Sequence, residues 1–324
     1  MPYELVVVAN RLPVDLTLGP DGSLSWSRSP GGLVSALEPV MREADGAWIG
    51  WSGTADLESE PFDADGMHLV PVCLTTDEVE EYYEGFANDT LWPLSHDVIS
   101  PPVYHRHWWE TYRRVNRRFA TEAARHAAPG AVVWVHDYQL QLVPGLLREL
   151  RPDLKIGYFH HIPFPPWEIF AQLPWRAAVI RGLLGADLLG FQRASDAANF
   201  LRNVRRLTDL KVSGALVTIP GEQERQVRAS AFPISIDSKA FDELARSEAV
   251  QARAAEIRRD LGNPKTVLLG VDRLDYTKGI RHRIKAYGEL VAEGRMPVGE
   301  AILVQVASPS REKVRAYMEL AVRL

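Results

Sequence analysis

Residues 5–9 read LVVVA, an apolar and mostly β-branched run close to the N-terminus. A strand that helices cover on both faces has this uninterrupted character, whereas a strand with one wet face alternates apolar and polar residues. Four later runs have the same character: AVVWVHDY (131–138), KIGYFHHI (155–162), ADLLGFQ (186–192) and AILVQVA (301–307). Together the runs predict a parallel sheet with helices on both faces.

Helix-like segments separate these strands. LVPGLLRELRP (142–152) has apolar residues at helical spacing, and the charged, amphipathic segment 241–262 ends at Gly262, so we expect one long helix there. Strands that alternate with helices indicate the α/β class. The passage from strand-like AFPISID into this helix predicts a domain boundary, with a first domain at 1–235 and a second at 236–324. The second domain is short for a doubly wound domain, which usually has roughly 100–150 residues.

Composition excludes several classes of protein. The 324 residues carry a net charge of −5, so no global positive field attracts nucleic acid. The single cysteine, Cys73, excludes an intramolecular disulfide framework and a cysteine-rich zinc site. No apolar run reaches the roughly 18–20 residues needed to span a bilayer, and the N-terminus lacks the features of a secretory signal. We therefore expect a cytoplasmic protein without a membrane or nucleic-acid partner.

Two stretches in the first third of the chain suit anions and sugars. Arg11 follows the first strand, and SPGGLVSAL (29–37) places Gly31 and Gly32 before an apolar helical pattern, where backbone N–H groups can approach a phosphate. A tight turn before a helix explains the same glycines. EEYYEGFANDTLWPLSHD (80–97) offers Tyr83 and Trp92 among turn-forming residues, either against a sugar or as a loop packed onto the core.

Polar side chains also follow two predicted strands. WVHDYQL (134–140) and YFHHIPFP (158–165) place Asp137 and His161 at the carboxyl ends of these strands, where open α/β sheets bind ligands. Adjacent histidines on a strand point to opposite faces, so a metal site that includes both His160 and His161 is disfavoured. We interpret His160 as structural.

The second domain carries cations after its strands. VDRLDYTKGI (271–280) holds Arg273 and Lys278, and SPSREKV (308–314) holds Arg311. Three cations gathered at one edge of a sheet repel one another unless an anion neutralises them, which points to a phosphate or diphosphate. The DAD triplet at 63–65 matches the Asp-x-Asp of metal-dependent sugar transferases, but no strand precedes it. The absence of GxSxG argues against a hydrolase triad.

These motifs occur in an order that resembles one known family. VVVANRLP, SPGGLVSAL, WIGWSG, EYYEGFANDTLWP, WVHDYQLQLVP, HIPFPPWEIF, LLGADLLGFQ, FPISID, RLDYTKG and SPSRE cover nearly the whole chain. They are similar to the motifs of the trehalose-6-phosphate synthases, the retaining nucleotide-sugar glycosyltransferases of family 20. The resemblance implies an α/β fold of the GT-B type, with two Rossmann-like, doubly wound parallel-sheet domains that face a cleft.

The resemblance also implies a reaction. The family transfers glucose from UDP- or GDP-glucose to glucose 6-phosphate and forms α,α-trehalose 6-phosphate. Residues 1–235 would then be the acceptor-binding domain, and 236–324 the first part of the donor-binding domain. The second domain is expected to be incomplete, because the family's later RDGMNLVAKEY-like segment is not found in this sequence.

Residue roles follow by motif. For the acceptor and its 6-phosphate, the resemblance implies Arg11, Trp51 (of WIGWSG), Tyr83, Trp92, Asp137 and Arg311. For the donor, it implies Gly31, Gly32, His161, Arg273 and Lys278, with Arg273, Lys278, Asp137 and His161 acting in catalysis. No metal and no cofactor are expected, and the family often forms homo-oligomers. Two alternatives stay open: a catalytically inactive phosphosugar-binding relative, and a pseudo-glycosyltransferase with a cyclitol acceptor.

Overall fold

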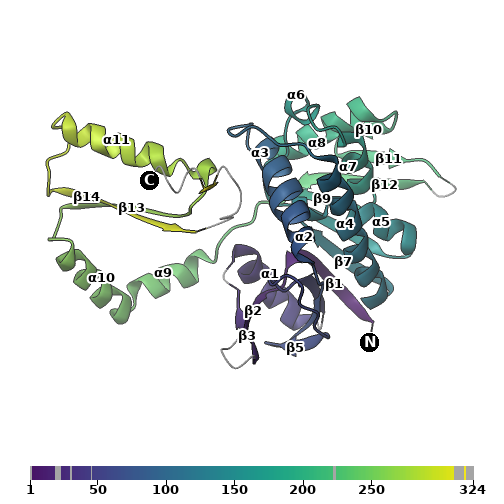
Figure 1. Cartoon of the computed structure of the whole chain (residues 1–324), viewed down its shortest axis with the longest axis horizontal. Helices are drawn as coiled ribbons and strands as arrows, with labels where there is room; N and C mark the ends of the chain where they lie inside the picture. The colour runs from purple at the N-terminus through teal and green to yellow at the C-terminus, as the bar shows by residue number, and fades with distance from the viewer. Residues whose placement is uncertain are drawn as a thin grey trace. The chain divides into compact units, whose positions relative to one another are not determined.

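The computed structural model describes residues 2–18, 23–29, 31–44, 46–221, 224–309 and 317–318. Its internal contacts divide the chain into two units, Met1–Ile234 and Ser235–Leu324. Strands and helices alternate along both units, and most strand pairs are parallel (Figure 1). The predicted α/β class is therefore confirmed.

One ten-stranded sheet organises the first unit. Its strands are β1 (Tyr3–Arg11), β4 (Ala47–Trp51), β5 (Phe62–Ala64), β6 (Met67–Pro71), β7 (Ala127–His136), β8 (Lys155–His160), β9 (Leu188–Phe191), β10 (Lys211–Ser213), β11 (Leu216–Ile219) and β12 (Arg225–Ala231). They lie in the order β10-β11-β12-β9-β8-β7-β1-β4-β6-β5. Only the pairs β10–β11, β11–β12 and β5–β6 are antiparallel. The chain leaves β1 first toward β4 and later toward β7, so the strand order reverses between β1 and β7.

Helices cover both faces of the central strand, as its sequence predicts. Every residue of β1 from Val6 to Asn10 is buried. Helix α4 (Arg106–His126) packs against β1, β4 and β7. Helix α1 (Gly32–Glu43) contributes Leu37 and Met41 to a core cluster that contains Val7. Successive side chains on a strand point to opposite faces, and both faces of β1 are buried.

The remaining elements of the first unit are shorter. They are β2 (Val14–Leu18), β3 (Leu24–Arg28), α2 (Thr76–Glu78), η1 (Val79–Leu91), α3 (Trp92–Ser95), η2 (Tyr138–Leu140), α5 (Val143–Leu150), α6 (Trp167–Phe170), α7 (Arg176–Leu183) and α8 (Ala194–Leu207). Strands β2 and β3 form an antiparallel hairpin beside the main sheet. No helix in the described part of the chain is both long and apolar enough to cross a bilayer.

The aromatic stretch at 80–97 is helical, so the expectation of a loop is wrong. Residues Val79–Leu91 form a wide π-helix that continues α2 and leads into α3. Tyr82 and Phe86 are fully buried on this helix and their rings contact Tyr112 of α4. Packing of these rings outweighs the local preference of the Gly, Asn and Asp residues for turns.

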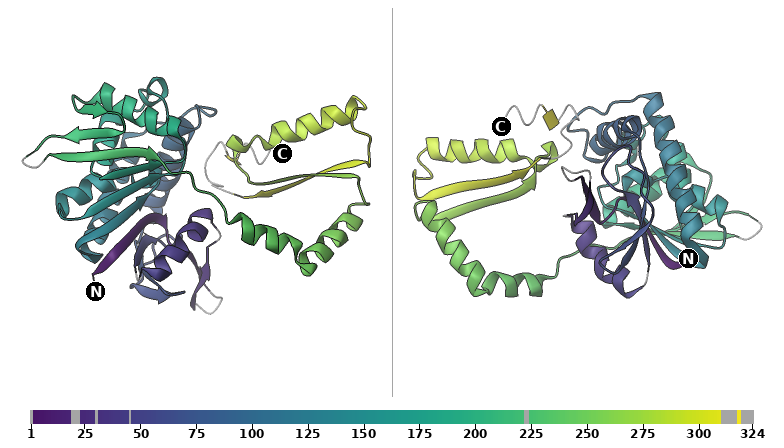
Figure 2. Two further views of the ribbon diagram at one scale, coloured as in Figure 1. Left: turned by 180° about the vertical axis from the view of Figure 1, so that it is seen from behind. Right: turned by 60° about the horizontal axis from the view of Figure 1, so that its bottom comes forward.

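The second unit contains one pair of parallel strands, β13 (Thr266–Arg273) and β14 (Ala301–Ser308). Helix α11 (Ile280–Ala292) lies on one side of this pair, and α9 (Ser238–Arg246) and α10 (Glu248–Asp260) lie on the other (Figures 1 and 2). The prediction of a single helix over 241–262 is wrong. Ser247 is extended, with ψ 144°, and its hydroxyl donates to the Leu244 carbonyl at 2.7 Å. This side-chain hydrogen bond competes with helical backbone pairing.

Candidate functional site

The carboxyl ends of four neighbouring strands hold half of the predicted site residues of the first unit. In the sheet, β4, β1, β7 and β8 are adjacent and parallel. Trp51 and Arg11 end β4 and β1, while Asp137 and His161 directly follow β7 and β8. The strand order reverses between β1 and β7, and open α/β sheets bind ligands at the carboxyl edge beside such a reversal. The topology therefore supports this edge as a ligand site.

Arg11, Trp51 and Tyr83 come together at this edge. The guanidinium carbon of Arg11 lies 4.9 Å from the centre of the Trp51 ring, which is a cation–π distance. The ring centres of Trp51 and Tyr83 are 5.7 Å apart. Arg11 also donates from Nη2 to the Asp15 carboxylate at 2.5 Å. A cation beside two amphipathic rings suits a ligand that has both an anionic group and a sugar face.

Gly53, which was not among the predicted site residues, makes this arrangement possible. Its φ is +93°, a conformation that favours glycine, and a Cβ at this position would overlap the Arg11 guanidinium. Glycine therefore leaves room for the arginine to lie over Trp51. The Trp-Ser-Gly end of WIGWSG was the available signal, but sequence alone does not give the backbone angle.

Asp137 is held in a strained backbone conformation. Its φ and ψ are +73° and 171°, a region populated almost only by glycine. Its N–H donates to the Phe159 carbonyl at 2.8 Å, and its Oδ1 accepts from the His161 N–H at 3.1 Å. These bonds join the turn after β7 to the turn after β8. The two predicted residues Asp137 and His161 are therefore in direct contact.

A second histidine contacts His161. Nδ1 of His136 and Nε2 of His161 lie 3.0 Å apart. Burial lowers the pKa of His161, although the Asp137 carboxylate opposes this shift. Burial and the neighbouring His161 lower the pKa of His136 well below its ordinary value. Both rings are therefore neutral near pH 7. His136 was not among the predicted site residues, although it stands directly before Asp137.

His160 faces away from this pair. Its Nδ1 lies 3.0 Å from the Tyr158 hydroxyl, and Phe164 and Phe191 contact its ring. Burial lowers the pKa of His160 to about 4. These neighbours agree with the structural role that we predicted. Across the described residues, no group of three or more His, Cys, Asp and Glu side chains is placed to hold a metal ion.

Trp92 is buried close to the segment that follows Asp137, whereas Gly31 and Gly32 are exposed at the start of a helix. The buried Trp92 ring lies 4.1 Å from the His96 ring and 5.7 Å from the ring of Tyr138, the residue after Asp137. Trp92 thus supports the segment that follows Asp137. Gly31 and Gly32 are exposed at the start of α1, where no side chain caps the helix. The backbone N–H groups of this helix end are available to an anion.

In the second unit, one turn carries two of the predicted site cations, Arg273 and Lys278. Arg273 ends β13, and Lys278 ends the short helix η3 (Tyr276–Lys278) just before Gly279, whose φ is +64°. Asp275 is completely buried and accepts from the N–H and hydroxyl of Thr277 at 2.9 and 2.8 Å. This buried carboxylate fixes the turn between Arg273 and Lys278. The predicted Arg311 lies outside the described residues.

Comparison with known sequences gives a matching family and a similar curated protein. The family model described as glycosyltransferase family 20 matches residues 3–323. A curated relative, the trehalose-6-phosphate synthase of Mycobacterium sp. (strain KMS), is 57% identical over 323 residues, which are 98% of this chain. The match covers 66% of that relative, so this chain spans slightly less than two thirds of its length.

Two solved structures have a similar fold. One is trehalose-6-phosphate synthase from E. coli bound with UDP-2-fluoro glucose, with TM-score 0.84 and 30% identity over 98% of this chain and 68% of that one. The other is the UDP-forming α,α-trehalose-phosphate synthase of Burkholderia xenovorans in complex with glucose-6-phosphate, with TM-score 0.83 and 28% identity over 99% of this chain and 69% of that one. These neighbours confirm the predicted fold class, α/β of the GT-B type.

Proposed function

This chain belongs to glycosyltransferase family 20, and we propose on that premise that it acts in trehalose-6-phosphate synthesis. The reaction transfers glucose from UDP- or GDP-glucose to glucose 6-phosphate, with retention of configuration, and forms α,α-trehalose 6-phosphate. One observation carries the proposal: at the carboxyl edge of the sheet Arg11 lies over Trp51, whose ring is next to Tyr83, and Gly53 leaves room for the guanidinium.

Residues 1–235 supply the acceptor site in this proposal. The 6-phosphate of the acceptor pairs with Arg11, and the two rings pack against the sugar. Asp15 neutralises Arg11 when no ligand is bound, and a phosphate dianion competes with that single carboxylate. Asp137, fixed between β7 and β8, accepts a hydrogen bond from an acceptor hydroxyl. Trp92 and Arg311 complete the acceptor set by resemblance.

Residues 236–324 supply part of the donor site. Arg273 and Lys278, on either side of the turn fixed by Asp275, pair with the diphosphate, and Gly31, Gly32 and His161 contact the donor by resemblance. Negative charge grows on the diphosphate as the bond to C1 of glucose breaks. Fixed cations stabilise this transition state more than the ground state.

Retention follows from attack on the same face of the sugar that the leaving group occupies. The acceptor hydroxyl oxygen bonds to C1 as the C1–O bond to the diphosphate breaks. A departing phosphate oxygen takes the proton of that hydroxyl. No side-chain nucleophile is needed in this scheme. Its rate depends on Arg273 and Lys278, which stabilise the departing diphosphate.

The test measures nucleoside diphosphate release from UDP-, GDP- and ADP-glucose by this chain, with and without glucose 6-phosphate. We expect release that depends on the acceptor, and proton NMR should show an α,α-linked product. Arg11→Ala should raise the KM for glucose 6-phosphate, while Arg125→Ala, which removes an exposed arginine paired with Glu122, should not.

Other outcomes select the alternatives. Binding of glucose 6-phosphate without any turnover would favour an inactive phosphosugar-binding protein. Turnover only with a cyclitol acceptor would favour a pseudo-glycosyltransferase. A β-linked product would exclude the retaining mechanism.

A further inference from the structure

Helix α4 concentrates positive charge in a chain whose net charge is −5. Its sequence, RHWWETYRRVNRRFATEAARH, contains six arginines and two glutamates. Its buried face packs on the sheet, and its exposed face carries Arg113, Arg114 and Arg117. None of these arginines has a role in the proposed glucosyl transfer.

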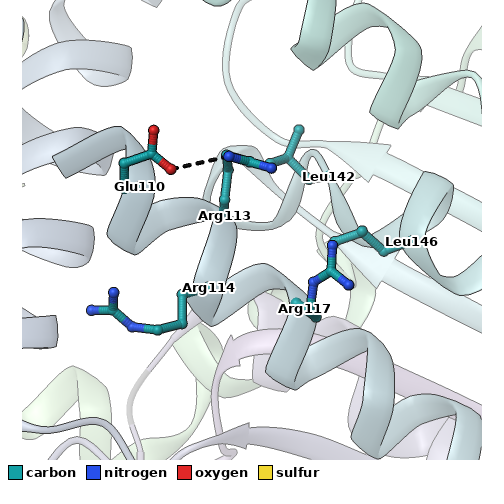
Figure 3. Close-up of a pocket in the computed structure, with 6 residues that line it drawn as sticks. All are labelled: Glu110, Arg113, Arg114, Arg117, Leu142 and Leu146. Carbon is teal, nitrogen blue, oxygen red and sulfur yellow. Dashed lines mark hydrogen bonds and ion pairs between the residues drawn. The ribbon is translucent and has the colours of Figure 1, made fainter. Parts of the chain in front are cut away.

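A surface cavity of about 280 Å³ lies between α4 and α5. Its lining consists of Glu110, Arg113, Arg114, Arg117, Leu142 and Leu146 (Figure 3). The guanidinium groups of Arg113 and Arg117 extend toward the leucines of α5, whereas that of Arg114 points away from them (Figure 3). The cavity therefore has a cationic wall on one helix and an apolar wall on the other.

The positive charge in this cavity is only partly neutralised. Arg114 pairs with Glu78 at 3.3 Å and Arg113 pairs with Glu110 at 3.0 Å. Within the described part of the chain, the Arg117 guanidinium makes no ion pair or hydrogen bond. Arg113 and Arg117 also stand four residues apart on one helix face, where like charges repel. An anion between them would remove this repulsion.

The start of α5 adds to the positive potential. Leu142 is the N-cap residue of α5 and offers no side-chain hydrogen bond to the first turn. The N-terminus of a helix carries a partial positive charge. The Leu142 N–H already donates to Asn116 and Pro144 has no N–H, so α5 contributes through this charge and not through free donors. Because Leu142 also lines the cavity, this helix end and the two arginines act on the same space.

We infer that this cavity binds a phosphate group, carried by inorganic phosphate or by a small phosphate monoester. Arg113 and Arg117 contact the phosphate, the positive end of α5 adds to the potential around it, and Leu142 and Leu146 contact the organic part of a monoester. Guanidinium groups match the geometry of phosphate oxygens, and the apolar wall suits a compact organic group.

The phosphate cavity shares Leu142 with the segment that follows Asp137 in the sequence. On the buried side of α4, Asn116 donates to the Gln139 carbonyl at 3.0 Å and accepts from the Leu142 N–H at 3.1 Å. The same Leu142 lines the phosphate cavity. Asn116 of α4 thus binds the segment from Gln139 to Leu142 on its buried side, and a phosphate in the cavity would lie next to the same segment on its solvent side. Phosphate binding in this cavity does not depend on the proposed reaction.

Calorimetric titration with inorganic phosphate at low ionic strength tests the site. All proteins in the series carry Arg11→Ala, so that phosphate binding at the proposed acceptor site is removed. Arg117→Gln is compared with Arg125→Gln, which removes one charge from the same helix at a position paired with Glu122 and outside the cavity lining. We expect Arg117→Gln to weaken phosphate binding by about tenfold or more and Arg125→Gln by less than about twofold, because loss of a charge-assisted hydrogen bond is local.

Crystals soaked in tungstate, a heavy analogue of phosphate, give an independent readout. An anomalous peak between Arg113 and Arg117 would support the site, and its absence at saturating tungstate would overturn it. Equal losses in Arg117→Gln and Arg125→Gln would also overturn it, because general attraction to α4 would then explain the binding. Tighter binding of glucose 6-phosphate than of inorganic phosphate would identify a monoester as the ligand, and the reverse order would identify the free anion.

Discussion

The Nδ1 atom of His136 and the Nε2 atom of His161 lie 3.0 Å apart, at the ends of neighbouring parallel strands. Burial keeps the pKa of both rings low, so one neutral ring donates to the other. The second nitrogen of His136, Nε2, is buried without a partner among the described residues. His136 therefore has one evident polar role, which is to orient the His161 ring.

Substitution of His136 should lower the efficiency with which the nucleotide-sugar donor is used, and should leave binding of the acceptor largely unchanged. Asn at this position can place an amide near the site of Nδ1, whereas Phe cannot bond to His161. We expect His136→Phe to lower kcat/KM for the nucleotide sugar by about tenfold, the equivalent of one hydrogen bond, and His136→Asn to recover part of the loss. Steady-state kinetics with each substrate varied in turn check this. Equal losses in both variants, or a rise only in the KM for glucose 6-phosphate, would contradict the orienting role.

Lys278 should contribute to the chemical step. A preorganised donor at a developing negative charge typically contributes about 10²–10³ in kcat, so Lys278→Ala should lose that much and Lys278→Arg less. Lys285→Ala is the matched control, because Lys285 is exposed on α11 and, among the described residues, pairs with Glu289 alone. Turnover of Lys278→Ala within about threefold of the parent would show that Lys278 does not support the leaving group.

Glu78 should stabilise the first unit. Its buried carboxylate accepts two hydrogen bonds from Arg118, at 2.7 and 2.8 Å, and one from the Thr75 N–H. We expect Glu78→Gln to lower the free energy of unfolding by about 2 kcal/mol at neutral pH. Tryptophan fluorescence in a urea titration reports this unit, because all nine tryptophans lie within it. Glu149→Gln, at an exposed position of the same unit, should change little.

The same carboxylate predicts a dependence on pH. Burial acts to raise the pKa of Glu78, but hydrogen bonds from Arg118 and Thr75 outweigh it, and the pKa lies below the ordinary 4.5. The stabilisation is therefore fully present above the ordinary pKa and is lost as pH falls through the lowered value. If the difference between the parent and Glu78→Gln were unchanged at pH values below this range, the ion pair would not be its source.

Protonation of His160 should begin to lower the free energy of unfolding at a higher pH than protonation of Glu78 does. Burial lowers its pKa from 6.5 to about 4. The neutral ring is favoured in the fold, so its contribution is full above pH 6.5 and declines as pH falls toward 4. The decline should reach roughly 2–3 kcal/mol at about pH 4.5.

The comparison of two leucine variants checks this assignment. His160→Leu should flatten the loss of unfolding free energy between about pH 7 and pH 4.5, whereas the exposed His107→Leu should keep the slope of the parent. At pH 7 the His160 variant is expected to be less stable, because the Tyr158 hydroxyl loses its partner. Parallel slopes in parent and His160→Leu would assign the acid sensitivity to other groups.

Apolar runs were enough to predict the central architecture. Continuous burial from Val6 to Asn10 matches a strand covered on both faces, and strand ends located Arg11, Asp137 and His161 at one edge. These features depend on residue pattern and on the direction of parallel strands, both of which a sequence contains.

Features that depend on contacts between distant segments were not predicted. The need for glycine at position 53 arises from Arg11, which belongs to another strand, and the role of His136 arises from a ring that follows the next strand. The π-helix at 79–91 forms because Tyr82 and Phe86 pack on α4, against local turn preference. Ser247 breaks the predicted helix through a side-chain bond that its neighbours in sequence do not reveal.

The backbone of Asp137 has a consequence for the stability of the first unit. Asp137→Gly and Asp137→Ala both remove the carboxylate, but only glycine tolerates φ +73° and ψ 171° without strain. Glycine should therefore be more stable than alanine by about 1–3 kcal/mol in urea unfolding, while both variants lose activity. Equal stability would show that this conformation is not strained. A screen that selects only for thermal stability should therefore enrich glycine here, and discard the carboxylate to which we assign an acceptor-binding role in the proposed reaction.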